Sequence, residues 1–155
     1  MRVAIGSDHR GYPLKQALLA LLQELGHEYR DVGCFDSGAV DYPDVAQAVG
    51  QAVAEGRADQ GILICGSGVG MAMAANKIPG VRAAPCHDSL SARMTREHND
   101  ANVLCLGADY LGVGLAQDIV RAYLAAQFQG GRHSRRVEKI ANLEGRPTRE
   151  GASTA

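Results

Sequence analysis

The sequence lacks an excess of charge of either sign. Its 155 residues carry 16 Lys and Arg against 17 Asp and Glu, which gives a formal net charge of -1 with neutral histidines. The overall basic field that holds nucleic acid is therefore missing. No window approaches the roughly 20 apolar residues that a membrane-crossing helix needs. We therefore expect a small-molecule partner, and neither nucleic acid nor a membrane.

The beginning of the chain lacks the long apolar stretch and cleavage site of a secretory signal, because residues 1–6 pass directly into a short strand-like run. A cytoplasmic protein is expected. The four cysteines include no Cys-x-x-Cys pair, which argues against a zinc ribbon or a redox motif and favours free thiols. Cys34, Cys86 and Cys105 lie in a loop or in apolar strand-like runs, where a structural role is the simplest interpretation.

Familiar cofactor and phosphate motifs are missing as well. The five histidines form no His-x-x-x-His pair or Glu-bearing cluster, so we expect a site without a metal or another cofactor. The glycine-rich stretch that begins at Gly66 has Met71 at the sixth position, where a dinucleotide fingerprint needs glycine. The Gly-Lys-Ser/Thr of a P-loop is absent, and Met71 also occupies the arginine position of a Cys-x5-Arg phosphatase loop.

What the sequence does contain is a regular alternation of strand-like and helix-like segments. Strands are predicted over residues 2–6, 28–32, 61–65, 80–85 and 103–107, and helices over 12–25, 43–55, 69–77, 89–98 and 111–128. This alternation predicts an α/β fold, in which a five-stranded parallel sheet is covered by helices on both faces. A single domain is expected over residues 1–144. Paired glycines at 130–131 introduce a short cationic helix, and the polar tail 145–155 is predicted to be disordered.

Ligands of open parallel sheets bind beyond the carboxyl ends of the strands. Asp8 and His9 follow the first predicted strand, and Cys65 ends the third, so these three residues are expected at one edge of the sheet. Cys65 stands where a glycine-rich turn opens a helix. Backbone N–H groups gather at such a turn, which suits either a bound anion or an activated thiolate.

Each of these candidates also has a structural interpretation. The glycines that follow Cys65 can serve a tight packing turn, and Ser67 can be an N-cap. Asp8 and His9 can cap the following helix. Among later residues, His98 can be a surface or capping group at the end of a helix. Arg132 and Arg136 are four residues apart, so they share a helix face that either grips a phosphate or is solvated.

Taken in order, these segments resemble the type B ribose-5-phosphate isomerases. The resemblance runs from Met1 to about Glu144 and is carried by GSDHRG at 6–11, DYP at 41–43, GILICGSGVG at 61–70, AANK at 74–77, HNDANVL at 98–104 and GGRHxxRV at 130–137. It implies a Rossmann-like three-layer α/β/α sandwich with a C-terminal helical extension. It further implies a metal-free aldose–ketose isomerase of sugar phosphates, and a homodimer, or a homotetramer, whose sites draw residues from both subunits.

The resemblance also implies roles for individual residues. By position, Cys65 matches the base that removes the substrate proton, and His98 matches the general acid. Asp8 and His9 match residues at the sugar ring and the phosphate. The positions of the anion-hole loop are matched by Gly66, Ser67, Gly68, Val69 and Gly70, and further ligand-binding positions by Asn99, Arg132 and Arg136.

The expected activity is the interconversion of ribose 5-phosphate and ribulose 5-phosphate through an enediolate. The family often has an arginine after the Gly107-Ala108 turn, at a position that binds the substrate phosphate, whereas this chain has Asp109. We expect Asp109 to pair with a cation or to contact a sugar hydroxyl. Because related isomerases of allose or galactose 6-phosphate and of tetrose 4-phosphates share the scaffold, another sugar phosphate is the main alternative. A non-catalytic sugar-phosphate binding domain and a thiol-dependent phosphatase or transferase are the alternatives from other classes.

Overall fold

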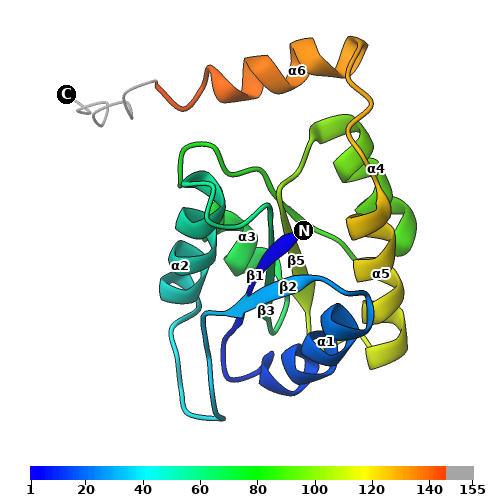
Figure 1. The fold of residues 1–155 in the computed structure, drawn as a ribbon. Helices are drawn as coiled ribbons and strands as arrows, with labels where there is room; N and C mark the ends of the chain where they lie inside the picture. The colour runs from blue at the N-terminus through cyan, green and yellow to red at the C-terminus, as the bar shows by residue number, and fades with distance from the viewer. Residues whose placement is uncertain (146–155) are drawn as a thin grey trace, which may run out of the picture.

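A computed structural model describes residues 1–145, in which strands and helices alternate as the sequence predicts (Figure 1). In chain order the elements are β1 (Arg2–Ser7), α1 (Tyr12–Glu24), β2 (Glu28–Asp31), α2 (Tyr42–Ala54), β3 (Gln60–Cys65), α3 (Val69–Ala75), β4 (Ala83–Pro85), α4 (Ser89–Asn99), β5 (Val103–Gly107), α5 (Val113–Ala125) and α6 (Arg132–Ala141). The tail predicted to be disordered lies outside the described residues, apart from Gly145.

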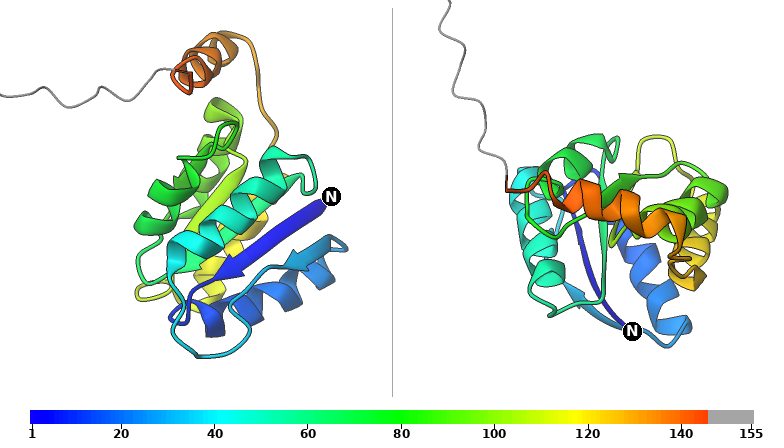
Figure 2. Two further views of the ribbon diagram at one scale, coloured as in Figure 1. Left: turned by 90° about the vertical axis from the view of Figure 1, so that its left-hand side faces the viewer. Right: turned by 90° about the horizontal axis from the view of Figure 1, so that it is seen from above.

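The five strands form one parallel sheet in the order β2-β1-β3-β5-β4. Seen from above, the sheet lies between α2 and α3 on one side and α1, α4 and α5 on the other (Figure 2). The predicted three-layer sandwich with a five-stranded parallel sheet is therefore confirmed. Because β3 is central, residues that follow it meet the loops after both of its neighbours, β1 and β5.

Alternation along the strands divides the core in two, since successive side chains point to opposite faces of a sheet. Odd and even positions of β1 illustrate this: Ile5 packs with α1 and α5, while Ala4 packs with α2 and α3. Burying a side chain such as Ile5 contributes about 1.5–3 kcal/mol. In β3 the same alternation turns Ile64 toward α1 and α5, and it turns Cys65 toward α2 and α3. The sulfur therefore lies on the side of the sheet where α3 begins.

Three predicted elements are longer than the observed ones by more than one residue, and one of them is the helix predicted over 69–77, which ends at Ala75. The strand predicted over 80–85 begins only at Ala83, since Gly80 has a φ of +83° and the Val81 N–H bonds to the Ile78 carbonyl in a turn. The helix predicted over 111–128 spans Val113–Ala125 instead. Extended backbone bounds it on both sides, with a ψ of 156° at Gly112 and 148° at Ala126.

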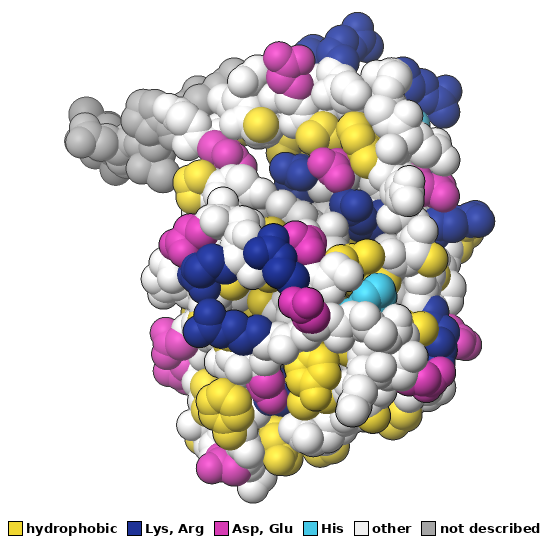
Figure 3. Space-filling view, in the orientation of Figure 1, with side chains coloured by type: hydrophobic (Ala, Val, Ile, Leu, Met, Phe, Trp, Pro, Cys, Tyr) yellow, Lys and Arg dark blue, Asp and Glu magenta, His cyan; other side chains and the backbone are white. Residues whose placement is uncertain are grey.

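The predicted cationic helix is present as α6, which lies apart from the sandwich across one end of the sheet (Figures 1 and 2). The Gln129 N–H donates to the Glu97 carbonyl at 3.0 Å, which ties the start of this extension to the last turn of α4. Basic and acidic side chains are interspersed on the face drawn in Figure 3. Among the helices within residues 1–145, none has the length and apolar character needed to cross a membrane.

Candidate functional site

Cys65 ends β3 at a sharp turn that only glycine can complete. The side chain is buried, and its sulfur accepts a hydrogen bond from the Gly68 N–H at 3.1 Å. Gly68 has a φ of +76°, and a Cβ there would lie 2.9 Å from the carbonyl carbon of Leu106. A side chain at position 68 would therefore meet both a left-handed backbone and a clash with β5. The turn holds the sulfur beside the first N–H groups of α3.

The loop after β5 supports this turn by binding three consecutive carbonyl groups. The bonds run from the Ala108 N–H to the Cys65 oxygen at 2.8 Å, from the Asp109 N–H to the Gly66 oxygen at 3.0 Å, and from the Tyr110 hydroxyl to the Ser67 oxygen. In a trans peptide, each carbonyl and the next N–H point to opposite sides. The N–H groups of Gly66 and Ser67 are therefore directed away from this loop, as is that of Gly68, which meets the sulfur. Such a set of N–H groups can stabilise a negatively charged oxygen.

The structural interpretation of the same loop also holds in part. The Ser67 hydroxyl accepts the Val69 N–H at 3.2 Å and so supports the turn before α3, although the N-cap residue is Gly68 and not Ser67. A Cβ at Gly70 would lie 2.7 Å from the ring of Tyr42, so this glycine also permits close packing. A closely packed glycine and a serine that supports the turn are thus compatible with anion binding there.

Asp8 and His9 lie at the same edge of the sheet as Cys65, as the sequence predicts. The Asp8 N–H bonds to the Ile64 carbonyl at 3.1 Å, and the buried Asp8 carboxylate accepts the Gly11 N–H at 2.9 Å. The interpretation of this pair as helix caps is wrong, because Gly11 is the N-cap of α1 and Asp8 instead holds the preceding turn. His9 is exposed, and its Nδ1 accepts the Val40 N–H at 3.4 Å.

Asp109 forms an ion pair with Arg10, which confirms the expectation that it pairs with a cation. Arg10 Nε donates to Asp109 Oδ1 at 3.2 Å, and Nη2 donates to Oδ2 at 2.5 Å. Sequence reasoning did not single out Arg10, although it directly follows Asp8 and His9. The two partners are 99 positions apart, so no local pattern connects them.

Two tyrosines at this edge were also missed. The ring of Tyr42 faces Gly70, and Tyr110 lies against Gly107 with its hydroxyl on Ser67. The pKa of Tyr110 is raised, first by desolvation and then by the negative charges of Cys65 and Asp109 nearby. Tyr110 follows the fifth predicted strand, so the rule that ligands bind beyond the carboxyl ends of strands also points to it.

The remaining predicted site residues lie at the opposite edge of the sheet. His98 and Asn99 end α4 just before β5 begins, while Cys65 pairs in register with Gly107, the last residue of β5. The length of β5, about 13 Å at roughly 3.3 Å per residue, therefore separates the two edges. Arg132 and Arg136 are exposed on α6, which lies beside the end of α4. A single chain thus brings Asp8 and His9 close to Cys65. It leaves His98, Asn99 and the two arginines at the opposite edge of the sheet.

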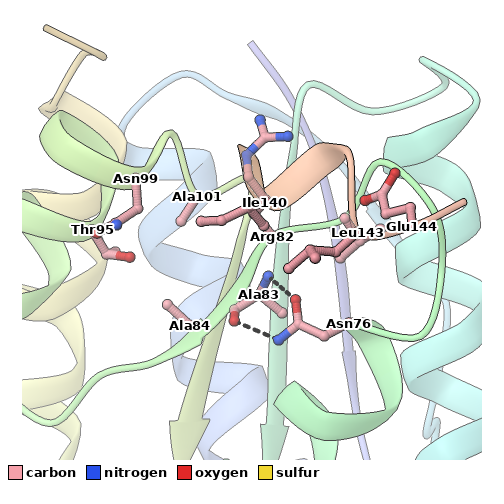
Figure 4. A pocket seen from close by; sticks show the side chains of 11 residues that line it. Asn76, Arg82, Ala83, Ala84, Thr95, Asn99, Ala101, Ile140, Leu143 and Glu144 are labelled. Atoms are coloured by element: carbon pink, nitrogen blue, oxygen red, sulfur yellow. Dashed lines mark hydrogen bonds between the residues drawn. The ribbon is translucent and has the colours of Figure 1, made fainter. Parts of the chain in front are cut away.

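A hollow of about 490 Å³ lies at this second edge, between α6, α4 and β4 (Figure 4). Its lining includes Asn99 and the apolar side chains of Ile140 and Leu143. The Asn76 side chain bonds to both the N–H and the carbonyl of Ala83, each at 2.8 Å, which fixes one wall. The lining contains none of the residues gathered around Cys65.

The other cysteines fit the structural role expected of them. All four are free thiols and all are buried. Desolvation raises the pKa of Cys86 to about 11 and holds the pKa of Cys105 well above its ordinary value, so both remain protonated. Within residues 1–145, His, Cys, Asp and Glu side chains form no group of three that could hold a metal ion.

Comparison with known proteins identifies relatives over nearly the whole chain. The family described as Ribose/Galactose Isomerase matches residues 3–140. Ribose-5-phosphate isomerase B of Escherichia coli K12 is 49% identical, over 94% of this chain and 97% of its own length. D-erythrulose-4-phosphate isomerase of Pectobacterium atrosepticum is 41% identical, over 93% of this chain and 95% of its own length. The solved structure of Clostridium thermocellum ribose-5-phosphate isomerase B superposes with a TM-score of 0.92 at 52% identity, covering 93% of this chain and 97% of the other.

Proposed function

Because the chain belongs to the ribose/galactose isomerase family, we propose that it interconverts ribose 5-phosphate and ribulose 5-phosphate. The observation that carries this proposal is the position of Cys65. Its sulfur sits at the carboxyl edge of the sheet, within 3.1 Å of the Gly68 nitrogen and beside the N–H groups of Gly66 and Ser67. A base and donors for a developing oxyanion thus come from one short turn.

The reaction moves a carbonyl group from C1 to C2 of the sugar. In the proposed step, the Cys65 thiolate removes the proton from C2 of the open-chain aldose. The electrons of that bond form a double bond to C1, and the carbonyl oxygen takes up negative charge. The Cys65 thiol then returns its proton to C1, and the proton of the C2 hydroxyl is transferred to O1, which gives the ketose and restores the thiolate. The overall change is an isomerisation in which no atoms are gained or lost.

The N–H groups of Gly66 and Ser67 are directed to the side where this charge would develop. Donors fixed before the reaction stabilise an enediolate oxygen without having to reorient. Asp8, His9 and Val69 to Gly70 line the same edge and would contact the sugar. A cyclic substrate must first open, which needs an acid or a base, and either Asp8 or His98, the assigned general acid, would serve.

The position of His98 supports a site that is shared between two subunits. His98 and Asn99 lie at the opposite edge of the sheet from Cys65, and Arg132 and Arg136 lie on the adjacent α6. We assign these four residues to the site of a second copy of the chain, in a homodimer. The two exposed arginines would then hold the phosphate by charge-assisted hydrogen bonds. Binding energy from this remote group would position the reacting carbons.

The proposal is tested by turnover of a panel of four-, five- and six-carbon aldose phosphates. We expect the highest kcat/KM with ribose 5-phosphate. A higher kcat/KM with a tetrose 4-phosphate would instead favour the kind of substrate named for the Pectobacterium relative, D-erythrulose-4-phosphate isomerase. The absence of turnover with every member of the panel would favour a sugar-phosphate binding domain.

A further inference from the structure

The ion pair between Arg10 and Asp109 forms a wall of the turn that follows Cys65. Arg10 lies in the loop after β1 and Asp109 in the loop after β5, so the pair joins the loops on both sides of β3. A Cβ built at Gly66 would lie 2.9 Å from Asp109 Oδ2 and 3.1 Å from Arg10 Nε. The guanidinium thus lies close to Gly66, the first residue of the proposed anion hole.

Stability alone does not account for this pair. The side chains of Arg10 and Asp109 are 59% and 43% exposed, and ion pairs this exposed typically contribute only about 0–1 kcal/mol. The loops they join are already fixed through the backbone, since the Asp109 N–H binds the Gly66 carbonyl at 3.0 Å. The side chains at this position are therefore available for a different role.

The guanidinium keeps unused donors that can bind an anion. Of its five N–H donors, Asp109 takes one from Nε and one from Nη2, and no other hydrogen bond joins the Arg10 side chain to a residue within 1–145. The remaining three N–H groups lie on Nη1 and the outer side of Nη2, away from the carboxylate. A planar pair of donors on one edge matches two oxygens of a phosphate.

We propose that Arg10, oriented by Asp109, binds the phosphate group of the substrate together with Arg132 and Arg136 of the second copy. This inference rests on the proposed function. Arg10 stays at the exposed mouth of the site, whereas the sulfur of Cys65 is buried beneath the turn, so the guanidinium meets the outer, charged end of the sugar phosphate. Asp109 binds the edge of the guanidinium formed by Nε and Nη2, and its negative charge repels phosphate from that edge.

The test compares Arg10→Ala and Arg10→Lys with the wild-type protein, using ribose 5-phosphate as substrate and inorganic phosphate as inhibitor. Arg10→Ala should raise KM and the inhibition constant of phosphate by about tenfold or more, the usual effect of losing a charged hydrogen bond, with kcat within about threefold. Arg2→Ala is the matched control, because Arg2 and Asp59 form a similarly exposed pair at the other end of β1. We expect the control to leave both constants within about twofold.

Arg10→Lys separates binding from a merely structural role. Lysine keeps a charge for Asp109 but cannot supply the planar pair of donors, so KM should still rise several-fold if Arg10 binds phosphate. A wild-type KM in Arg10→Lys, or unchanged phosphate inhibition in Arg10→Ala, would overturn the proposal.

A failure of the proposed function would be recognised separately. If the wild-type protein turns over no sugar phosphate in the panel, calorimetric binding of inorganic phosphate replaces the kinetic readout. Weaker binding by at least about tenfold in Arg10→Ala would then support the role of Arg10. Equal binding by the wild-type protein and the variant, or no binding by either, would reject it.

Discussion

The imidazole rings of His98 and His133 stack with their centroids 4.3 Å apart and their planes within 6° of parallel. His98 belongs to the last turn of α4, and His133 to the first turn of α6. The stack therefore fixes the proposed general acid relative to the helix that carries Arg132 and Arg136. If His98 enters the active site of a second subunit, Arg132 and Arg136 therefore enter the same site.

The surroundings of His133 make stability depend on pH. The pKa of His133 is lowered, first by desolvation and then by the positive charges of His98, Arg132 and Arg136. As the pH falls below about 6.5, the unfolded chain takes up a proton at this position more readily than the folded one, so the folded state loses stability. Above that pH the loss is absent.

We therefore predict that Tm falls between pH 7 and pH 5, and that it falls less in His133→Gln. Thermal unfolding followed by circular dichroism in matched buffers checks this. An equal fall in the variant and the wild-type protein would show that protonation of His133 does not contribute.

The assignment of His98 to a second subunit predicts that two inactive variants can restore each other. When Cys65→Ala and His98→Asn are coexpressed with different tags, a hybrid dimer contains one intact site. Random pairing should then recover about a quarter of the wild-type activity, because half of the dimers are hybrids with one working site of two.

A matched control uses two variants from the same edge of the sheet. Cys65→Ala combined with Asp8→Asn should recover nothing, because every site of that hybrid keeps one defect. If the mixture of Cys65→Ala and His98→Asn also recovers nothing, Cys65 and His98 do not act across subunits.

The two arginines of α6 are predicted to hold the phosphate. Because a hydrogen bond to a charged group contributes roughly 1.5–3 kcal/mol, Arg132→Ala or Arg136→Ala should each raise KM about tenfold to a hundredfold, with a smaller effect on kcat. Steady-state kinetics with ribose 5-phosphate measures both constants. Arg135→Ala, on a neighbouring exposed position of the same helix, is the control and should leave KM unchanged. Equal effects of all three substitutions would indicate a general charge effect.

Much of the fold could be predicted because the local signals agree with one another. Apolar runs of strand length alternate with helices that carry Pro13 or Pro43 in their first turn and stop near Gly26 or Gly56, and the sheet follows from that alternation. The start of β4 was misjudged because Val81 is buried yet belongs to a turn. An apolar residue in a turn carries the same sequence signal as one in a strand.

The site could be predicted only in part, because some of its contacts join residues that are distant in the sequence. The rule that ligands bind at the carboxyl ends of strands correctly brings Asp8, His9 and Cys65 together. The same reasoning cannot assign Arg10 to Asp109, because that pairing depends on side-chain directions in two loops that are distant in sequence. It also cannot show whether residues beside His98, at the edge where β5 begins, meet Cys65 of a second copy of the chain.

The central claim is that Cys65 removes the substrate proton, and the turnover of ribose 5-phosphate by Cys65→Ala tests it most directly. The account predicts that kcat falls by about a hundredfold or more, as for the loss of a general base, while equilibrium binding of ribose 5-phosphate stays within a few-fold of wild type. A kcat close to the wild-type value in a folded Cys65→Ala protein would contradict it.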